Sequence, residues 1–316
     1  MANKVNSLTE GGILSAITVI MAVIAVYVPL LGMVALLLWP LPMIVLIVRH
    51  GLKWGLMSAV VAGILTAVLI EPLTALRLTL SFAPCGLALG IGYRKKWAST
   101  SVFATGMVVS IVSKVVALGL VFFLTGIHPF SSVFDMMDQS YGQTEAFYQS
   151  INMSAGQIEA ARENYTANMA MVRQLVPLIV ILAGLVDTAM NFIIGGKVLR
   201  RLGHEVVAFP PFMEWRLSPG FAYLYCFSLI GMYWGQAHGM PVLQQISLNA
   251  NMLGTMAGML QGLVLYECAM EHYHISKLIN MIVIVLIFFS GVFMQILVFV
   301  GIFDMVVDYR SRLFKR

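Results

Sequence analysis

Long apolar runs separated by short polar connections dominate the chain. Six of them precede residue 200, at residues 12–31, 33–48, 52–70, 76–93, 100–125 and 175–196. A helix of about 20 apolar residues crosses the hydrocarbon core of a bilayer, so each run predicts one membrane-spanning helix. Pro29, Pro40 and Pro42 interrupt the first two runs and are expected to kink or break the helix locally.

Three further apolar runs follow at residues 220–236, 243–265 and 275–307. As one helix the last run would be about 50 Å long at 1.5 Å per residue, beyond a hydrocarbon core of roughly 30 Å. A break at Ser290 and Gly291 would make it a short helical hairpin. The pattern predicts an all-α polytopic transmembrane bundle with about eight to ten membrane segments. The number of membrane segments is smaller if a polar run such as 243–265 does not cross the membrane.

The composition agrees with this pattern. Sixty per cent of the 316 residues are hydrophobic and 10% are charged, whereas a soluble domain carries about 25% charged residues. A soluble domain of this composition would lack a surface for water. The expected partner of most of the chain is therefore the lipid bilayer.

Basic residues cluster between the runs, and their position predicts the orientation. The clusters are Arg49, His50 and Lys53, then Arg94, Lys95 and Lys96, then Lys197, Arg200 and Arg201. They follow the second, fourth and sixth runs, and the positive-inside rule makes that side cytoplasmic. The N-terminus and a tail with Arg310, Arg312, Lys315 and Arg316 are then cytoplasmic too. The net charge of +5 is explained by these clusters, so no nucleic-acid partner is expected.

The chain is expected to have two parts. Residues 1–200 form a six-span domain with an outer loop at 126–174, and residues 201–316 add helices that end in a short hairpin and the basic tail. Within the outer loop, Ser154 and Gln157 have the spacing of a capping box. A helix beginning there could continue into the sixth span, with a kink at Pro177.

Ionisable residues inside the spans are the candidate sites, because charges in a bilayer are costly. Lys114 and Asp187 are expected at similar depth on neighbouring antiparallel helices, with Asn191 one turn from Asp187. The three could bind a ligand or ion, form a buried pair that fixes helix packing, or not meet. Arg77 near the outer face could bind an anionic group of a substrate or simply be solvated.

Amides and glycines mark two kinds of helix contact. Gln244, Gln245, Asn249, Asn251 and Gln261 fall in one run and could bind a ligand or, more commonly, join helices. Gly254, Gly258 and Gly262 follow at four-residue spacing and permit close helix approach, a pattern repeated at Gly51–Gly55 and Gly86–Gly90. Gly12 and Ala16 form a small-residue strip on the first helix, for internal packing or for a partner helix.

Motifs of catalysis and cofactor binding are missing from the sequence. HExxH, GxSxG, GxxxxGK[ST] and GxGxxG are all absent, and the three cysteines form no CxxC pair. The expectation is a protein that is not an enzyme and uses no cofactor or resident metal. Without an ATP-binding motif, energy for any transport would come from partners or gradients.

Several short stretches carry a resemblance to a known family. Leu8-Thr9-Glu10-Gly11 leads into the first helix, and Arg49-His50-Gly51-Leu52-Lys53 joins the second and third spans. Gly301-Ile302-Phe303-Asp304 and Asp308-Tyr309-Arg310 close the chain. The sequence resembles the YybS family of bacterial membrane proteins, which implies a multi-pass protein of the cytoplasmic membrane.

The YybS family is distantly similar to the S components of energy-coupling factor transporters. The resemblance implies capture of a small molecule and pairing with a transmembrane coupling subunit and two ATPases, with Gly12 and Ala16 facing that subunit. On this hypothesis the first six spans are S-component-like, and Arg77, Lys114, Asp187 and Asn191 are candidate substrate contacts. The alternative is a membrane scaffold or regulatory protein without transport. The substrate is not predicted.

Overall fold

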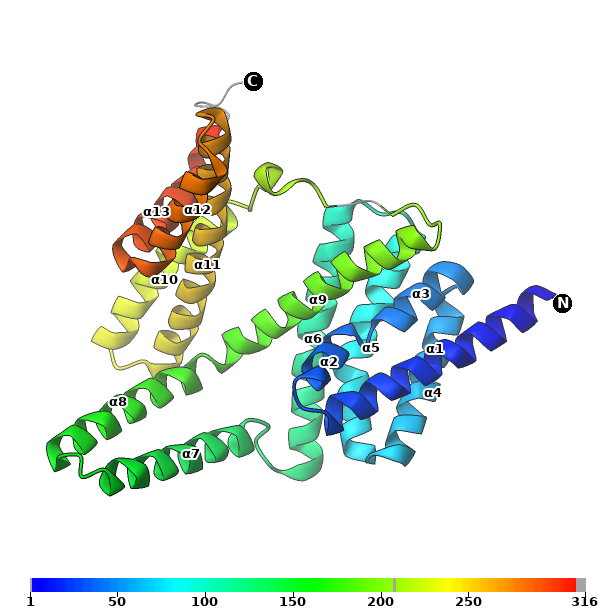
Figure 1. The fold of residues 1–316 in the computed structure, drawn as a ribbon, viewed down its shortest axis with the longest axis horizontal. Helices are drawn as coiled ribbons and strands as arrows, with labels where there is room; N and C mark the ends of the chain where they lie inside the picture. Colours follow the sequence, from blue (N-terminus) through cyan, green and yellow to red (C-terminus); the bar gives the residue numbers. More distant parts are fainter. Residues whose placement is uncertain (1, 207–208, 311–316) are drawn as a thin grey trace. The chain divides into compact units, whose positions relative to one another are not determined.

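The computed structural model describes residues 2–206 and 209–310. In this part of the chain every regular element is helical, so the predicted all-α class is confirmed (Figure 1). The chain divides into two compact units. Unit 1 comprises residues 1–165 and 179–209, and unit 2 comprises residues 166–178 and 210–316.

Unit 1 contains the helices of the first six predicted spans. They are α1 (Ala2–Tyr27), α2 (Leu31–Leu38), α3 (Leu41–His50), α4 (Leu52–Leu69), α5 (Pro72–Arg94), α6 (Ser99–Thr125) and most of α9 (Val176–Arg201). Helix α1 begins at Ala2, ten residues before its apolar run, and α2 and α3 share one run; the other helices match their runs within five residues at each end. Helices α2 and α3 together form the second span, Leu31–His50.

The number of spans is lower than the estimate from the sequence. By length and composition, six segments of the described chain can cross a membrane, or seven if the bent pair α12 and α13 counts as one span. The runs at 220–236 and 243–265 do form helices, α10 (Gly220–Ala237) and α11 (Pro241–His272). Amide and aromatic hydroxyl groups make both helices too polar to qualify as membrane spans by their mean hydropathy. The predicted number of eight to ten membrane segments is therefore corrected to six or seven.

The second span is broken where prolines were expected to interrupt it. Helix α2 ends at Leu38 and α3 begins at Leu41, with Trp39 and Pro40 between them. Pro40 and Pro42 each lack the backbone N–H that a continuous helix would donate four residues back. The break therefore leaves backbone carbonyls near residue 37 available to other partners.

Small residues let the helices of unit 1 approach closely. A methyl group at Gly90 would lie 2.9 Å from Ile47, and one at Gly86 would lie 3.0 Å from Pro40. Gly55 also faces Ile47. Gly55, Gly86 and Gly90 thus bring α3, α4 and α5 together, whereas Gly51 lies between α3 and α4 with φ of 104° and is not part of a helix stripe.

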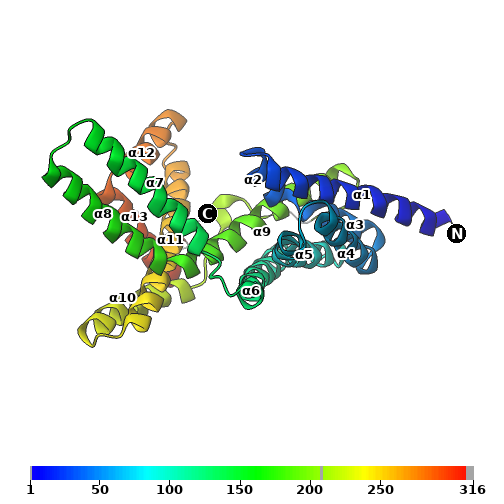
Figure 2. The same ribbon diagram turned by 90° about the horizontal axis from the view of Figure 1, so that it is seen from below.

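The segment expected as an outer loop is mostly helical. It forms helices α7 (Ser131–Ser150) and α8 (Ala155–Gln174), and within unit 1 the first half of α8, up to Tyr165, packs against α7 (Figures 1 and 2). The rings of Tyr141 and Tyr165 stack with centroids 4.0 Å apart, and the Tyr165 hydroxyl donates to Asp138 at 2.7 Å. The predicted capping box is confirmed, because the Gln157 N–H donates to Ser154 Oγ at 3.4 Å and the Ser154 N–H donates to Gln157 Oε1 at 3.3 Å.

Unit 2 contains α10, α11, α12 (Lys277–Phe289) and α13 (Gly291–Val307), preceded by a 3-10 turn at Phe212–Glu214. The predicted break at Ser290 is confirmed, and α12 and α13 meet there at 102°. Arg310 is buried and donates to the carbonyls of Met213 and Trp215 at 2.9 and 2.8 Å. Arg312, Lys315 and Arg316 of the predicted tail lie outside the described residues.

The glycine stripe of α11 is a packing surface. Gly254 faces Tyr225 of α10, while Gly258 and Gly262 face Val298 and Leu297 of α13. Gly301 of α13 sits against the backbone of Gly258 and Gly262, so the two helices cross almost in backbone contact. The small-residue spacing of the sequence is therefore used within unit 2.

Apart from the exposed Gln244, the amides of α11 join helices, as the commoner interpretation proposed. The Asn249 side chain donates to the Gln174 carbonyl at 2.8 Å and accepts from the Leu178 N–H at 2.9 Å. In a continuous helix Leu178 would donate to Gln174 directly, but Leu175 separates α8 from α9 and Pro177 follows. Asn249 therefore bridges the break between the two helices with one amide.

Asn249→Ala is expected to destabilise unit 2 by about 1–3 kcal/mol, because Gln174 and Leu178 would each lose a partner for a backbone group. Amide hydrogen exchange at Leu178 should accelerate, and the thermal unfolding temperature should fall. Gln244→Ala is the matched control, since Gln244 is an exposed amide on the same helix. Equal effects of the two changes would contradict the bridging role.

Candidate functional site

Lys114 of α6 and Asp187 of α9 form an ion pair inside unit 1. Lys114 Nζ lies 2.8 Å from Asp187 Oδ2. Lys114 is 8% exposed and Asp187 is 0% exposed. The structure thus brings together the two charges that the sequence placed at similar depth, whereas their role in binding remains a prediction.

The Lys114 ammonium is surrounded by oxygen atoms. Besides Asp187 it donates to Ser110 Oγ at 2.9 Å and to the Ser81 carbonyl of α5 at 3.4 Å. It also lies 4.6 Å from the centroid of the Phe82 ring. An ammonium has three N–H donors, and all three find an acceptor here.

The carboxylate of Asp187 is held on both oxygens. Oδ2 also accepts from the Ser110 hydroxyl at 2.8 Å, and Oδ1 accepts from Asn191 Nδ2 at 2.9 Å. Charge-assisted hydrogen bonds of this kind offset part of the cost of removing an ionised group from water. The pair is therefore closed and saturated in this structure.

Asn191 connects the ion pair to the broken second span. Its Nδ2 donates to the Leu37 carbonyl of α2 at 2.8 Å as well as to Asp187. Its Oδ1 is buried without a hydrogen-bond partner in the described chain, and so is Nε1 of Trp39 at the break itself. Most buried polar atoms are paired, so these two mark the break as a place where a polar group from elsewhere could bind.

Sequence reasoning missed part of this network. Ser110 lies one helical turn before Lys114 and could have been found from that spacing. Ser81 and Leu37 contribute backbone carbonyl groups to the network, and a backbone carbonyl cannot be recognised from the type of side chain in the sequence. Trp39 gave no signal either, because its burial in a cluster with Ala22, Leu78 and Phe82 depends on tertiary packing.

The other candidate residues lie apart from the pair. Arg77 is exposed near the start of α5. Gly12 and Ala16 are exposed on α1, and a methyl group added at Gly12 would meet open space in the described structure. A neighbouring face of α1 makes the internal contacts, where Ser15 Oγ lies 2.8 Å from Ser58 Oγ. Of the two roles proposed for the Gly12 and Ala16 strip, internal helix packing is therefore not seen among the described residues of unit 1.

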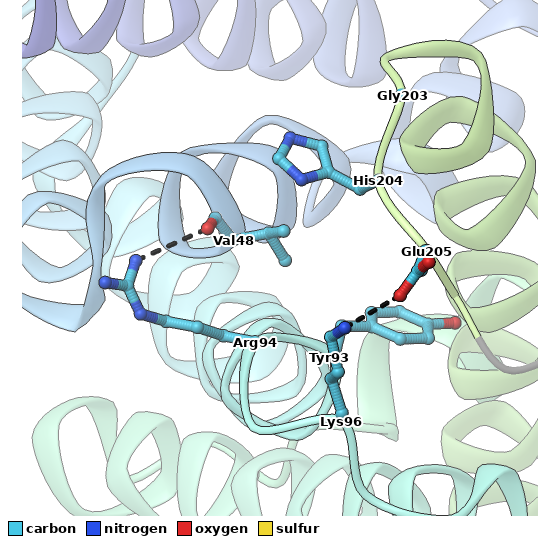
Figure 3. A pocket seen from close by; sticks show the side chains of 7 residues that line it. All are labelled: Val48, Tyr93, Arg94, Lys96, Gly203, His204 and Glu205. Carbon is cyan, nitrogen blue, oxygen red and sulfur yellow. Dashed lines mark hydrogen bonds and ion pairs between the residues drawn. The ribbon is translucent and has the colours of Figure 1, made fainter.

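A polar cavity of about 300 Å³ lies at the end of unit 1 that carries the basic clusters (Figure 3). Arg94 donates to the Ile47 and Val48 carbonyls at 2.8 and 3.3 Å, which suits the last turn of a helix. Lys96 forms an ion pair with Glu205 at 2.8 Å. The Lys96–Glu205 pair is largely exposed to solvent, whereas the Lys114–Asp187 pair is buried, so this cavity is the weaker candidate site.

The Lys96 ammonium lowers the pKa of Glu205 below its ordinary value of 4.5, through a hydrogen bond and charge attraction. The stabilisation from this pair should be present above the ordinary carboxylate pKa and lost as the pH falls through the lowered one. Lys96→Gln should raise the pKa of Glu205, measured from its side-chain carboxyl ¹³C shift. Lys95→Gln is the control, and an equal rise there would contradict the assignment.

Six apolar spans with a charged pair at their centre define a polytopic α-helical membrane protein. The family model of a predicted membrane protein, DUF2232, matches residues 16–305, and the chain belongs to this family. The chain is similar to the uncharacterized protein YybS of Bacillus subtilis (strain 168), at 24% identity over 311 residues, covering 98% of this chain and 99% of that protein. The YybS-family resemblance is confirmed. No solved structure matches the chain.

Proposed function

We propose that this protein is the solute-recognising membrane component of a transport system, similar in role to an S component. The observation that carries the proposal is the desolvated Lys114–Asp187 pair beside the broken second span. Charged side chains inside spans are usually kept for ligand or ion handling. Discontinuous helices likewise line the binding sites of many transporters.

The closed pair sets a condition on the solute. Separating Lys114 from Asp187 without replacement would leave two uncompensated charges in a low-dielectric interior, at about 3–5 kcal/mol. A solute that reaches the site must therefore offer polar groups to both residues. Arg77, exposed near the start of α5, supplies a first contact for an anionic group before entry.

The proposed energy source is a separate set of subunits. The sequence has no ATP-binding motif, and the protein itself is proposed to catalyse no reaction. The exposed strip at Gly12 and Ala16 suits close approach of a helix from a coupling subunit. Two ATPases would act through that subunit.

A membrane scaffold is the second candidate function. The saturation of the Lys114–Asp187 pair favours it, because a pair with every donor matched can hold α5, α6 and α9 together without any ligand. The close contact between α11 and α13 would then support protein assembly rather than solute movement.

Affinity purification from the native membrane tests the proposal. We expect a transmembrane coupling subunit and ATPases to co-purify with the wild type, and a Gly12→Leu, Ala16→Leu variant to lose them. Ile20→Leu, on an exposed position of the same helix, is the control. Absence of such partners, together with no thermal shift across a panel of vitamins and divalent metal ions, would favour the scaffold.

A further inference from the structure

We infer that the oxygens around Lys114 form a monovalent-cation site, and that the Lys114 ammonium is the cation that fills it. The acceptors come from three helices: the Ser81 carbonyl of α5, the Ser110 hydroxyl of α6 and the Asp187 carboxylate of α9. Hard cations such as Na⁺ prefer this donor set of carboxylate, carbonyl and hydroxyl oxygens. The inference does not depend on the proposed transport role.

Oxygens from three helices surround Nζ, so Asp187 is not its sole partner. Three oxygens lie 2.8, 2.9 and 3.4 Å from the nitrogen. We call these three oxygens the cage; the Ser113 hydroxyl lies beside it and donates to the same Ser81 carbonyl at 3.1 Å. Removing the lysine side chain would leave these oxygens in place around a space with no positive charge.

A second observation comes from the neighbouring Asn191, which contacts the other oxygen of the Asp187 carboxylate. Asn191 Nδ2 donates to the Leu37 carbonyl, the Asp187 carbonyl and Asp187 Oδ1. These three acceptors fix the orientation of the amide, because a flipped amide would set oxygen against oxygen. Asn191 Oδ1 is therefore a true acceptor, fully buried next to Asp187 and without a partner among the described residues.

The charge of the site selects a monovalent ion. Asp187 supplies one negative charge, and Lys114 now balances it. A monovalent cation in place of Lys114 keeps the interior neutral, whereas a divalent cation would leave a net positive charge inside the membrane. When the Lys114 side chain is removed, a free monovalent cation beside Asp187 would therefore restore the neutrality of the site.

Chemical rescue of a Lys114 variant tests the inference. Lys114→Ala should lower the thermal unfolding temperature, and 150 mM NaCl or KCl should restore at least about a third of the loss. Choline chloride at the same concentration should not, because choline has the same ionic strength but is too large for the cage. The wild type should respond equally to all three salts, since its own ammonium occupies the site.

Two further variants separate cation binding from general salt effects. Lys114→Met fills the space without a charge and should show no difference between NaCl and choline chloride. Lys114→Ala with Asp187→Asn removes the counter-charge and should be equally insensitive. Lys114→Ser, which keeps a hydroxyl in the cage, provides a second test if Lys114→Ala does not fold.

The inference is overturned if neither Na⁺ nor K⁺ stabilises the Lys114→Ala or Lys114→Ser protein more than choline does. It is also overturned if the Asp187→Asn double variant is rescued to the same extent. These outcomes leave the co-purification result unaffected, so failure of the cation site and failure of the proposed function are distinguishable.

Discussion

Lys114→Ala and Asp187→Ala are each expected to reduce the free energy of unfolding by about 3–5 kcal/mol. Each change leaves the partner as an uncompensated charge in the interior of unit 1, where Asp187 is fully buried. The serine and asparagine contacts of Ser110 and Asn191 would remain but cannot neutralise the charge. This is the largest effect expected from any single substitution of a polar residue in the described spans.

The double variant should be less destabilised than the sum of the two single changes. Removing both charges eliminates the unpaired group that makes each single change severe, so the coupling energy is expected to be about 2 kcal/mol or more. Reversible unfolding in a defined lipid or bicelle system, followed by tryptophan fluorescence, gives the four free energies. Purely additive effects would refute a direct interaction between Lys114 and Asp187.

A methyl group at Gly301 is expected to disrupt the packing of unit 2. The added carbon would overlap the Gly258 carbonyl oxygen and the Gly262 nitrogen, which are backbone atoms and cannot rotate away. Helix α13 would have to move from α11 along the length of their contact. Over-packing usually costs about 1–3 kcal/mol, and Gly301→Ala should fall at or above the upper end because two helix backbones must separate.

Gly291→Ala is the matched control for this change. Gly291 begins the same helix, and a methyl group there meets open space in the described structure. Thermal unfolding and protease accessibility of α11 should change in Gly301→Ala and not in Gly291→Ala. A stable Gly301→Ala protein with unchanged protease resistance would show that α11 and α13 are not in close backbone contact.

The apolar pattern by itself determined the helical framework. Runs of sufficient length with so few charges have no stable alternative to helices in lipid, because backbone groups must be hydrogen-bonded internally. The sequence also predicted the two breaks. The break at Pro40 follows because proline lacks a backbone N–H donor, and the break at Ser290 follows because a single helix over 275–307 would be longer than the bilayer is thick. The capping box at Ser154 followed from local spacing alone.

The sequence also narrowed the polar centre to Lys114, Asp187 and Asn191. Charged residues are so rare in the predicted spans that two at similar depth are the obvious candidates for a pair. Asn191 joins them because it lies one helical turn from Asp187. Burial cost makes a partner necessary, so pairing was the expected outcome. The role of these residues toward a solute or ion did not follow from this reasoning.

Tertiary structure decided which oxygens complete that centre and which residues fill the gaps in the helices. The Ser81 and Leu37 carbonyls are identical to every other backbone carbonyl in the sequence, and only helix packing selects them. The same holds for Asn249, whose amide meets the break at Gln174 and Leu178 from a helix more than 70 residues away. Long-range register of this kind depends on how side chains of different helices fit together, which hydropathy along one chain does not encode.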